Sequence, residues 1–403
     1  MLRNQTFPNN WKACSVQEIF KPLPNLSFSR DQLTHKAQTL EYIHYGDIHT
    51  GCIDELISED SILPYLVKEH VVKNIDKYLL CPGDIVLVDA SEDYDGVTKS
   101  IEISNVGAKK IVAGLHTIPL RPLKGVFAPG FARYVFKHSI VSKTLKAIAQ
   151  GTKVFSISFA LIKKVILFCP PITEQQKIVE VLETWDKAIQ LTRKLIEQKE
   201  LQKKYLMQQL LTGRTRLKGF TGKWIPCKLK EICAIRKGEQ LNATELKDQG
   251  EYPCLNGGIA PSGYTDNWNT EKNTISISEG GNSCGYVNWN PKRFWAGGHC
   301  YTLSDIKANP EFLYFLLKNK EKHIMNLRVG SGLPNIQRSS LENLSLSIPE
   351  SKEEQSQIGR LLIGVDIGIE FAQKYLAKLE EQKKGLMQVL LTGKVRLAVK
   401  ETK

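Results

Sequence analysis

Two long segments of the chain place apolar residues at alternating spacings of four and three, which is the pattern of a heptad helix with one buried stripe. The first segment runs from Glu174 to Leu211, and its pattern returns from Glu354 to Leu391. A continuous helix over the first segment, about 38 residues, would be roughly 57 Å long. The apolar stripe, called the seam below, consists of Ile178, Leu182, Trp185, Ile189, Ile196, Leu206 and Leu210 in the first segment and Ile358, Leu362, Val365, Ile369, Leu376, Leu379, Leu386 and Leu390 in the second.

Both segments have helix-end signals. Capping-box patterns, Thr173-x-x-Gln176 and Ser351-x-x-Glu354, come just after prolines and predict where the helices begin. Gly213 and Gly393 stand where a residue of left-handed conformation ends a helix. We expect the two helices to pair with each other, because a seam of this length exceeds what one domain of about 130 residues can cover. Two ordinary amphipathic helices, each covering its own domain, remain the alternative. Two similar halves that meet through one shared face favour a pseudo-twofold, antiparallel arrangement.

The helices are part of an internal repeat. The string Leu206-Met-Gln-Gln-Leu-Leu-Thr-Gly213 returns as Leu386-Met-Gln-Val-Leu-Leu-Thr-Gly393, with seven of eight positions identical. Weaker matches lie upstream, where Trp11-x-x-Cys14 corresponds to Trp224-x-x-Cys227. The chain therefore alternates a variable globular unit with a shared segment, twice.

The variable units have the patterns of mixed α/β domains. We expect strands at 84–89, 109–113, 164–168, 274–278 and 344–348, helices at 131–149 and 311–327, and polar, glycine-rich loops at 45–51, 256–268, 279–285 and 328–338. The predicted domains are 1–170, the first helix 171–213, a second domain 214–349, and the second helix with its tail 350–403. The predicted fold class is α+β, with two mixed α/β domains separated by two long helices that pair as an antiparallel coiled coil in a pseudo-twofold internal repeat.

The charge balance favours a polyanionic partner. Lys and Arg total 55 against 42 Asp and Glu, a formal net charge of +13, although excess Lys that only solubilises the surface remains an alternative. Hydrophobic residues make up 42% and charged residues 24% of the chain. This balance allows substantial cores to form. No apolar run approaches the ~18 residues of a membrane span, and the first residues lack the apolar region of a secretory signal, so we expect a cytoplasmic protein.

The chain lacks the motifs of several kinds of site. None of its nine cysteines forms a C-x-x-C pair, so we expect reduced thiols and no zinc site. His44-x4-His49 is not convincing metal spacing without a Cys or carboxylate partner. There is no phosphate-binding G-x-x-x-x-G-K-[ST] loop, no G-x-S-x-G elbow and no H-E-x-x-H. Asn309-Pro-Glu-Phe312 lacks the second proline of an amino-methyltransferase motif. We therefore expect a protein that is not itself an enzyme.

The glycine-rich loops contain side chains that can contact nucleic acid, because Asn, Arg and Lys present the hydrogen-bonding forks that match base edges and phosphates. For each one alone, a solvated loop residue or a satisfied aromatic residue remains the alternative. The candidate contacts are His44, Tyr45, His116 and Lys153 in the first unit and Tyr264, Asn267, Trp268, Asn282, Lys292, Arg293, His299, Arg328 and Arg338 in the second.

These features resemble the DNA-specificity (S) subunits of type I restriction-modification enzymes along the whole chain. The resemblance rests on Pro171-x-x-Glu174-Gln175 through Gly213 and on Glu354-Gln355 through Gly393, each preceded by a domain that would be a target-recognition domain. The second junction differs slightly, because Pro349 lies six positions before Gln355 whereas Pro171 lies four before Gln175.

The resemblance implies that each recognition domain reads one half of a bipartite, gapped DNA target. It also implies that the helices set the spacing and dock two methyltransferase subunits, and that two restriction subunits join the complex. S-adenosylmethionine, ATP and Mg²⁺ are then expected on those partners and no cofactor in this chain. Helix residues around Gln175, Ile178, Gln202, Lys203 and Leu206 would be docking or strut residues.

Two alternatives stay open, a free-standing DNA-binding regulator or orphan subunit and a coiled-coil adaptor that does not bind DNA. If the helices act as a spacer, we expect Leu182→Asp to abolish specific recognition while the separate domains stay folded.

Overall fold

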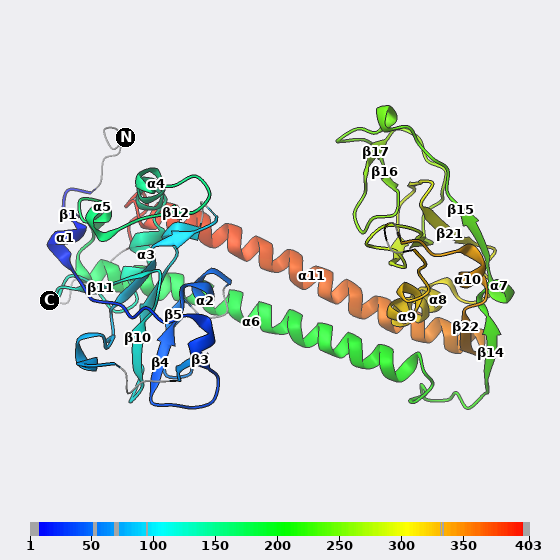
Figure 1. Ribbon diagram of the computed structural model, residues 1–403, viewed down its shortest axis with the longest axis horizontal. Helices are drawn as coiled ribbons and strands as arrows, with labels where there is room; N and C mark the ends of the chain where they lie inside the picture. The colour runs from blue at the N-terminus through cyan, green and yellow to red at the C-terminus, as the bar shows by residue number, and fades with distance from the viewer. Residues whose placement is uncertain are drawn as a thin grey trace. The chain divides into compact units, whose positions relative to one another are not determined.

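The computed structural model describes residues 8–50, 55–67, 72–93, 96–330, 332 and 334–397. The chain divides into two compact units (Figure 1). The first unit contains Met1–Gln190 and Ala377–Lys403, and the second contains Leu191–Leu376. Each unit therefore combines a mixed α/β domain with half of each long helix.

The first unit is built on two main sheets. The five-stranded sheet has the order β2 (Phe20–Pro22), β11 (Thr117–Pro122), β7 (Ile85–Val88), β9 (Ser100–Ile103), β5 (Leu56–Ile57), and the four-stranded sheet has the order β10 (Lys110–Ala113), β4 (Leu40–Ile43), β6 (Tyr65–Leu66), β3 (Leu33–Thr34). Two antiparallel pairs complete it, β1 (Lys12–Ser15) with β13 (Ile166–Cys169) and β8 (Ala90–Ser91) with β12 (Phe155–Ser156). Its short helices are α1 (Val16–Ile19), α2 (Tyr45–Thr50), α3 (Ala132–Lys137), α4 (Ser139–Ile148) and α5 (Phe159–Ile162), with 3₁₀ turns at Arg30–Gln32, Ile75–Lys77 and Gly96–Thr98.

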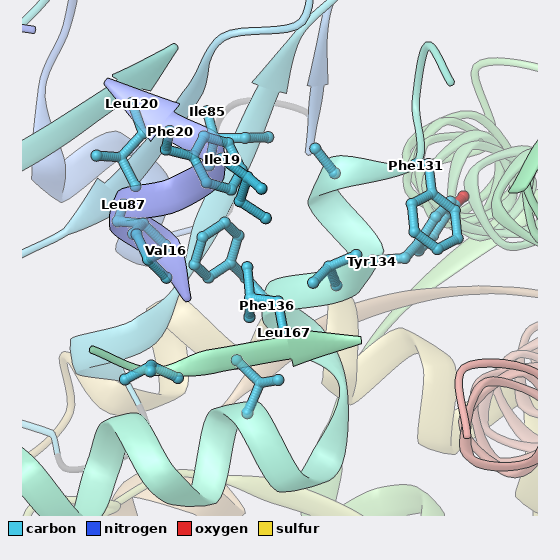
Figure 2. Packing of buried hydrophobic residues seen from close by; sticks show 14 of the residues in the cluster. Val16, Ile19, Phe20, Ile85, Leu87, Leu120, Phe131, Tyr134, Phe136 and Leu167 are labelled. Carbon is cyan, nitrogen blue, oxygen red and sulfur yellow. The ribbon is translucent and has the colours of Figure 1, made fainter. Parts of the chain in front are cut away.

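The central strand β7 shows why the first sheet forms. Its sequence, Ile-Val-Leu-Val, is apolar at every position, as a strand covered on both faces requires, and all four residues are buried. Ile85 and Leu87 face one core, in which Phe20 and Phe136 also lie (Figure 2). Val86 and Val88 belong to a separate cluster on the other side of the sheet.

The second unit repeats the plan with fewer strands. Its sheets are β15 (Ala234–Lys237), β21 (Cys300–Ser304), β18 (Thr274–Ser278), β19 (Val287–Asn290) in one, β17 (Gly263–Thr265), β16 (Tyr252–Leu255), β20 (Trp295–Ala296) in another, and the pair β14 (Trp224–Lys228) and β22 (Ser345–Pro349). Its short helices are α7 (Leu229–Ile232), α8 (Pro310–Asn319), α9 (Glu321–Met325) and α10 (Arg338–Glu342), with a 3₁₀ turn at Ala243–Glu245. The expected strands at 84–89, 109–113, 164–168, 274–278 and 344–348 are all present, with slightly shifted bounds.

The two long helices are α6 (Ile172–Leu210) and α11 (Lys352–Leu390), each of 39 residues (Figure 1). In the first unit the start of α6 packs in one core with the end of α11, since Ile178 and Leu182 share a cluster with Leu390. In the second unit the roles are exchanged, with Leu210 beside Ile358 and Leu362. The helices therefore run antiparallel in both units, which confirms the predicted fold class.

Ion pairs repeat the same exchange. Lys383 of α11 pairs with Asp186 of α6 in the first unit, and Lys203 of α6 pairs with Asp366 of α11 at 2.6 Å in the second. The two lysines occupy equivalent positions of the repeat, and so do the two aspartates, as a pseudo-twofold requires.

The helix ends agree with the sequence at three of four places. Gly213 and Gly393 have φ values of 71° and 68°. This is the left-handed conformation predicted for them. The hydroxyl of Ser351 accepts a hydrogen bond from the backbone N–H of Glu354 at 3.3 Å. Thr173 does not cap α6, because the carbonyl of Pro171 accepts from the N–H of Gln175 and the helix already begins at Ile172.

Four other expectations need correction. The helix expected at 131–149 is interrupted at His138, whose ψ of 132° is extended because its Nδ1 accepts from the N–H of Ile140 and starts a new helix. The helix expected at 311–327 is likewise divided, by Lys320, into α8 and α9. The predicted loop at 45–51 forms α2, and the loop at 256–268 contains β17. Of the predicted loop residues, 51, 331 and 333 lie outside the described part.

Leu182 also differs from its expected role. Its side chain is fully buried in the same core as Phe131 and Tyr134, so it supports the first domain itself as well as the helix pair. Leu182→Asp should therefore unfold part of the first unit rather than leave it folded. Within the described residues, no helix is both long and apolar enough to cross a membrane.

Candidate nucleic-acid interface

Three of the four first-unit candidates gather around the ring of Tyr45 at the start of α2. The Tyr45 ring centroid lies 4.7 Å from that of His44 and 5.1 Å from that of His116, with His49 at 5.8 Å. His44 is buried and its Nδ1 accepts from the N–H of Gly46. Burial, with the nearby Arg30 charge, lowers the pKa of His44, so its imidazole stays neutral at neutral pH.

His116 faces a carboxylate that sequence reasoning missed. Asp89 directly follows β7, His116 directly precedes β11, and Nδ1 of the imidazole lies 3.3 Å from Oδ1 of Asp89. His116 has a φ of 57°. Such a value is uncommon for a residue other than glycine. Burial raises the pKa of Asp89, and the imidazole opposes that shift.

Lys153, the fourth candidate, is exposed in the turn that leads into β12. This turn lies near Asp89 and His116, since the N–H of Ile157 donates to the backbone carbonyl of Asp89. The structure thus brings His44, Tyr45 and His116 together and leaves Lys153 at the margin.

In the second unit, one group of candidates surrounds Glu279, which the sequence analysis had not singled out. Glu279 is 9% exposed, and its Oε1 accepts from Lys237 Nζ at 2.8 Å and from the Tyr301 hydroxyl at 2.9 Å. Nδ1 of the exposed His299 lies 3.5 Å from Oε2. Burial, followed by the contact with Glu279, raises the pKa of Tyr301, so the phenol keeps the proton that it donates.

The loops that meet at Glu279 contain the other members of this group. The N–H of Gly281 donates to the carbonyl of Pro334, and the N–H of Ile336 donates to the carbonyl of Glu279. Asn282 and Arg328 are exposed here. Arg338 is also exposed at the start of α10, where its Nε donates to Glu342 at 2.8 Å.

A second group of candidates lies around Trp268. The guanidinium of Arg293 stands 4.1 Å from the Trp268 ring centroid and also pairs with Glu271 at 3.1 Å. A cation at this distance from an indole is attracted to the face of the ring. Lys292 precedes Arg293 and is exposed. The remaining members, Tyr264 in β17 and Asn267, lie before Trp268 in the chain.

The shared Glu-Gln strings form buried joints, a name used here for the contacts of Glu174-Gln175 and Glu354-Gln355 with their domains. Both oxygens of Glu174 accept from Arg396, at 2.5 and 2.7 Å, and both oxygens of Glu354 accept from Arg216, at 2.6 and 2.7 Å. The amide of Gln175 accepts from Ala128 N–H and donates to the carbonyls of Val126 and Pro170. The side chain of Gln175 is therefore occupied within the joint.

The seam residues are buried or half-buried in every case. A different face of the helices is apolar and exposed. Leu191 and Leu195 of α6 and Phe371 and Tyr375 of α11, called the helix patch below, are exposed by 67%, 45%, 71% and 49%. Phe371 and Tyr375 occupy the positions of the repeat that correspond to Leu191 and Leu195, so the patch is itself repeated.

No metal centre is found in the part of the chain that the structure describes, because no three His, Cys, Asp or Glu side chains gather there. Nδ1 of His44 is occupied by Gly46, and Nε2 of His49 lies 3.1 Å from the carbonyl of Ala90. The eight described cysteines are free thiols.

Comparisons with known proteins identify the family. The model of the type I restriction modification DNA specificity domain matches residues 8–201 and 222–381. A Methanocaldococcus jannaschii protein named as a putative type I restriction enzyme specificity subunit is 26% identical over 97% of this chain and 95% of its own length. A Mycoplasma pneumoniae protein named as a putative type I specificity subunit is 37% identical over 150 residues, which span 36% of this chain and 40% of that relative.

A solved structure agrees in fold. The crystal structure of a type I restriction-modification S subunit from M. genitalium superposes with a TM-score of 0.66 at 19% identity, over 96% of this chain and 97% of that one. The chain belongs to the family of type I restriction-modification DNA specificity domains. Specificity subunits are non-catalytic, so the family agrees with the expectation that this chain is not itself an enzyme.

Proposed function

We propose that this chain supplies the DNA sequence specificity of a type I restriction-modification complex, with each unit reading one half of a bipartite, gapped duplex target. The observation that supports this proposal most directly is the contrast between shared and divergent parts. Both units repeat the joint, the glycine at the helix C-terminus and the Lys–Asp pair. Apart from His116 and His299, the candidate reading residues differ between the two units. Two units with the same helix contacts but different candidate DNA-contacting residues suit a DNA target whose two halves differ in sequence.

The helix pair would set the number of unread base pairs between the half-sites. Lys383–Asp186 and Lys203–Asp366 support this role, because charged pairs beside an apolar seam favour one register over a slipped one. A flexible connection could not hold a fixed spacing.

The helix patch would dock the partner methyltransferases. In the second unit, Lys203 lies opposite Asp366 on antiparallel helices. Leu195 lies about two turns before Lys203, and Tyr375 lies about two turns after Asp366, so these two residues stand at the same level of the helix pair. Leu195 and Tyr375 also occupy the same heptad position, beside the seam, and therefore lie on one side of the helix pair. Clustered exposed apolar side chains mark interaction surfaces. Two copies of one partner suit a surface that is itself pseudo-symmetric.

In this proposal the chemistry belongs to the partners. Two methyltransferase subunits would bind S-adenosylmethionine and flip the target adenine out of the duplex, and two restriction subunits would use ATP and Mg²⁺. This chain would hold none of these cofactors and would place the partners on the DNA.

The test is a map of N6-methyladenine across the host genome with this gene intact and disrupted. We expect methylation at one bipartite, gapped motif to disappear in the disrupted strain. If no motif changes, salt-sensitive duplex binding by the purified chain would favour a free-standing regulator or orphan subunit. If the chain also fails to bind duplex DNA, the proposal is wrong and a coiled-coil adaptor remains.

Docking is tested separately with Leu191→Ser combined with Phe371→Ser in the full chain. We expect this variant to stay folded, because both side chains are exposed, and to lose co-purification with the methyltransferase. Leu201→Ser is the matched control, since Leu201 is another α6 leucine that is 60% exposed but lies outside the helix patch. Equal co-purification by all three proteins would exclude docking through the patch.

A further inference from the structure

The two units place a carboxylate and a histidine at the same point of the fold, although these residues are not part of the repeated strings. In the first unit Asp89 follows β7 and His116 precedes β11, which pairs with β7 so that Val88 lies opposite Thr117. In the second unit Glu279 follows β18 and His299 precedes β21, and Ser278 lies opposite Cys300. Both pairs thus stand just beyond the last residues of an equivalent antiparallel strand pair.

Backbone hydrogen bonds show that the positions are equivalent. The N–H of Asp89 donates to the carbonyl of His116 at 3.1 Å, and the N–H of Glu279 donates to the carbonyl of His299 at 2.9 Å. The carbonyl of each acidic residue in turn accepts from an isoleucine N–H, from Ile157 in one unit at 2.8 Å and from Ile336 in the other at 2.8 Å.

The side chains also share an unusual state. Oδ1 of Asp89 and Oε2 of Glu279 are buried atoms that receive no hydrogen bond within the described residues. Each of these oxygens is the one that faces the imidazole, with Nδ1 at 3.3 Å in the first unit and 3.5 Å in the second. Because a buried carboxylate oxygen without a donor is costly, each of these oxygens depends on the facing Nδ1–H for its hydrogen bond.

The imidazoles themselves are open to solvent. The side chains of His116 and His299 are 45% and 62% exposed. Glycines keep the surroundings of His299 open, since a Cβ at Gly257 would come within 3.1 Å of its Cβ and one at Gly280 within 3.7 Å of its Nδ1. The edge of a base can therefore approach Nε2, the ring nitrogen that does not face the carboxylate.

The charge of the pair decides which part of a duplex it suits. A phosphate brought to the imidazole would also approach the carboxylate, and the two anions would repel. In the neutral imidazole, the carboxylate favours the tautomer with the proton on Nδ1, and Nε2 is then a hydrogen-bond acceptor. Acceptors of this kind match the exocyclic amino groups that adenine and cytosine present in the major groove.

We infer that each carboxylate–histidine pair is a specificity element that reads a base amino group in the half-site of its own unit, with His116 or His299 making the contact and Asp89 or Glu279 positioning it. This inference rests on the proposed function and assigns two residues of each unit to it. Lys237 and Tyr301 support the second pair by holding the other oxygen of Glu279.

The test uses selection of bound duplexes from a random library by the full chain, together with its methyltransferase where the two co-purify. His299→Ala should lower the preference at one position of one half-site by about 10-fold or more and leave the other half-site unchanged. His116→Ala should do the same in the other half-site. His323→Ala and His35→Ala are the controls, because both are exposed histidines of the same two units.

Glu279→Gln distinguishes positioning from folding. It should reduce the preference at the same position as His299→Ala, with no further loss in the double variant, while its thermal unfolding stays close to that of the unaltered chain. A base analogue that lacks the amino group at that position should weaken binding of the unaltered chain but not of His299→Ala.

Two results would overturn the inference. If every position keeps its preference in both histidine variants, the pairs do not read bases. If affinity falls uniformly and the salt dependence loses about one unit of slope, the histidines contact phosphate instead. A library in which the unaltered chain itself selects no motif would contradict the proposed function rather than the role of these pairs within it.

Discussion

The joint of the first unit and that of the second have the same bidentate Arg–Glu pair but different neighbours. In the first, the indole Nε1 of Trp11 donates to Glu174 at 3.1 Å, so this carboxylate has donors from two side chains. In the second, the indole Nε1 of the counterpart Trp224 is buried without a hydrogen bond among the described residues, and Arg216 alone bonds the oxygens of Glu354 there. The ion pair is therefore the same in both copies of the repeat, whereas the hydrogen bonds around it differ.

This difference teaches that the two units have separate constraints. The joint and the seam are present in both units and connect each domain to the long helices, whereas the loops of the two units contain mostly different candidate residues. The carboxylate–histidine pairs fall between these extremes, since their place in the fold is shared but the acidic residue is Asp in one unit and Glu in the other.

The largest expected effect comes from charging the shared core. Leu182→Asp should destabilise the first unit by about 4 kcal/mol or more, because it buries an unpaired carboxylate among apolar side chains. Leu362→Asp should do the same in the second unit, since both leucines are fully buried at equivalent positions. Urea unfolding with hydrogen exchange would assign the loss to a unit. A variant that loosens both units equally would show that the units do not unfold separately.

A smaller effect is expected for the two joints, whose contributions to the free energy of unfolding should differ. Arg216→Ala should cost about 3 kcal/mol, because it leaves a buried carboxylate without a side-chain donor, and Arg396→Ala about 1 kcal/mol less, because Trp11 still bonds Glu174. The measurement is chemical unfolding of both variants beside the matched Arg→Lys changes. Equal losses for the two alanine variants would mean that the indole adds nothing to the first joint.

The smallest effect concerns acid. Burial lowers the pKa of His138 from 6.5 to about 4, and its partnerless Nε2 is enclosed within the described part of the first unit. Between these two pKa values, His138 is protonated in the unfolded chain and neutral in the folded chain. Its contribution to the free energy of unfolding is therefore fully present above pH 6.5 and decreases as the pH falls. From pH 7 to 5 the loss should be about 2 kcal/mol.

The second unit has Lys320 at the corresponding break between helices, and this kind of side chain does not titrate in that range. His138→Gln keeps an acceptor for Ile140 and should flatten the pH dependence of the first unit, measured by thermal unfolding between pH 4 and 7. The same slope in both proteins would assign the acid sensitivity to other groups.

Local pattern was sufficient for the helices and for most central strands. The seam of α6 and α11 could be read because a heptad repeats every few residues, and Ile85–Val88 because a run of four apolar residues suits a strand covered on both faces. Helix interruptions at His138 and Lys320 were missed, because amphipathic spacing continues across them and only the backbone conformation reveals the break.

The sequence by itself determined the class of the protein, through the duplicated helices, the net charge of +13 and the recurring Leu-Thr-Gly strings. These signals survive in one dimension because each repeat string and each turn of the heptad depends on near neighbours along the chain. Only the tertiary structure joined Arg396 to Glu174, 222 residues apart, and Asp89 to His116. Such contacts follow from antiparallel helix pairing and from strand pairing. These pairings bring together residues that lie far apart along the chain, and no repeating sequence pattern marks which residues will meet.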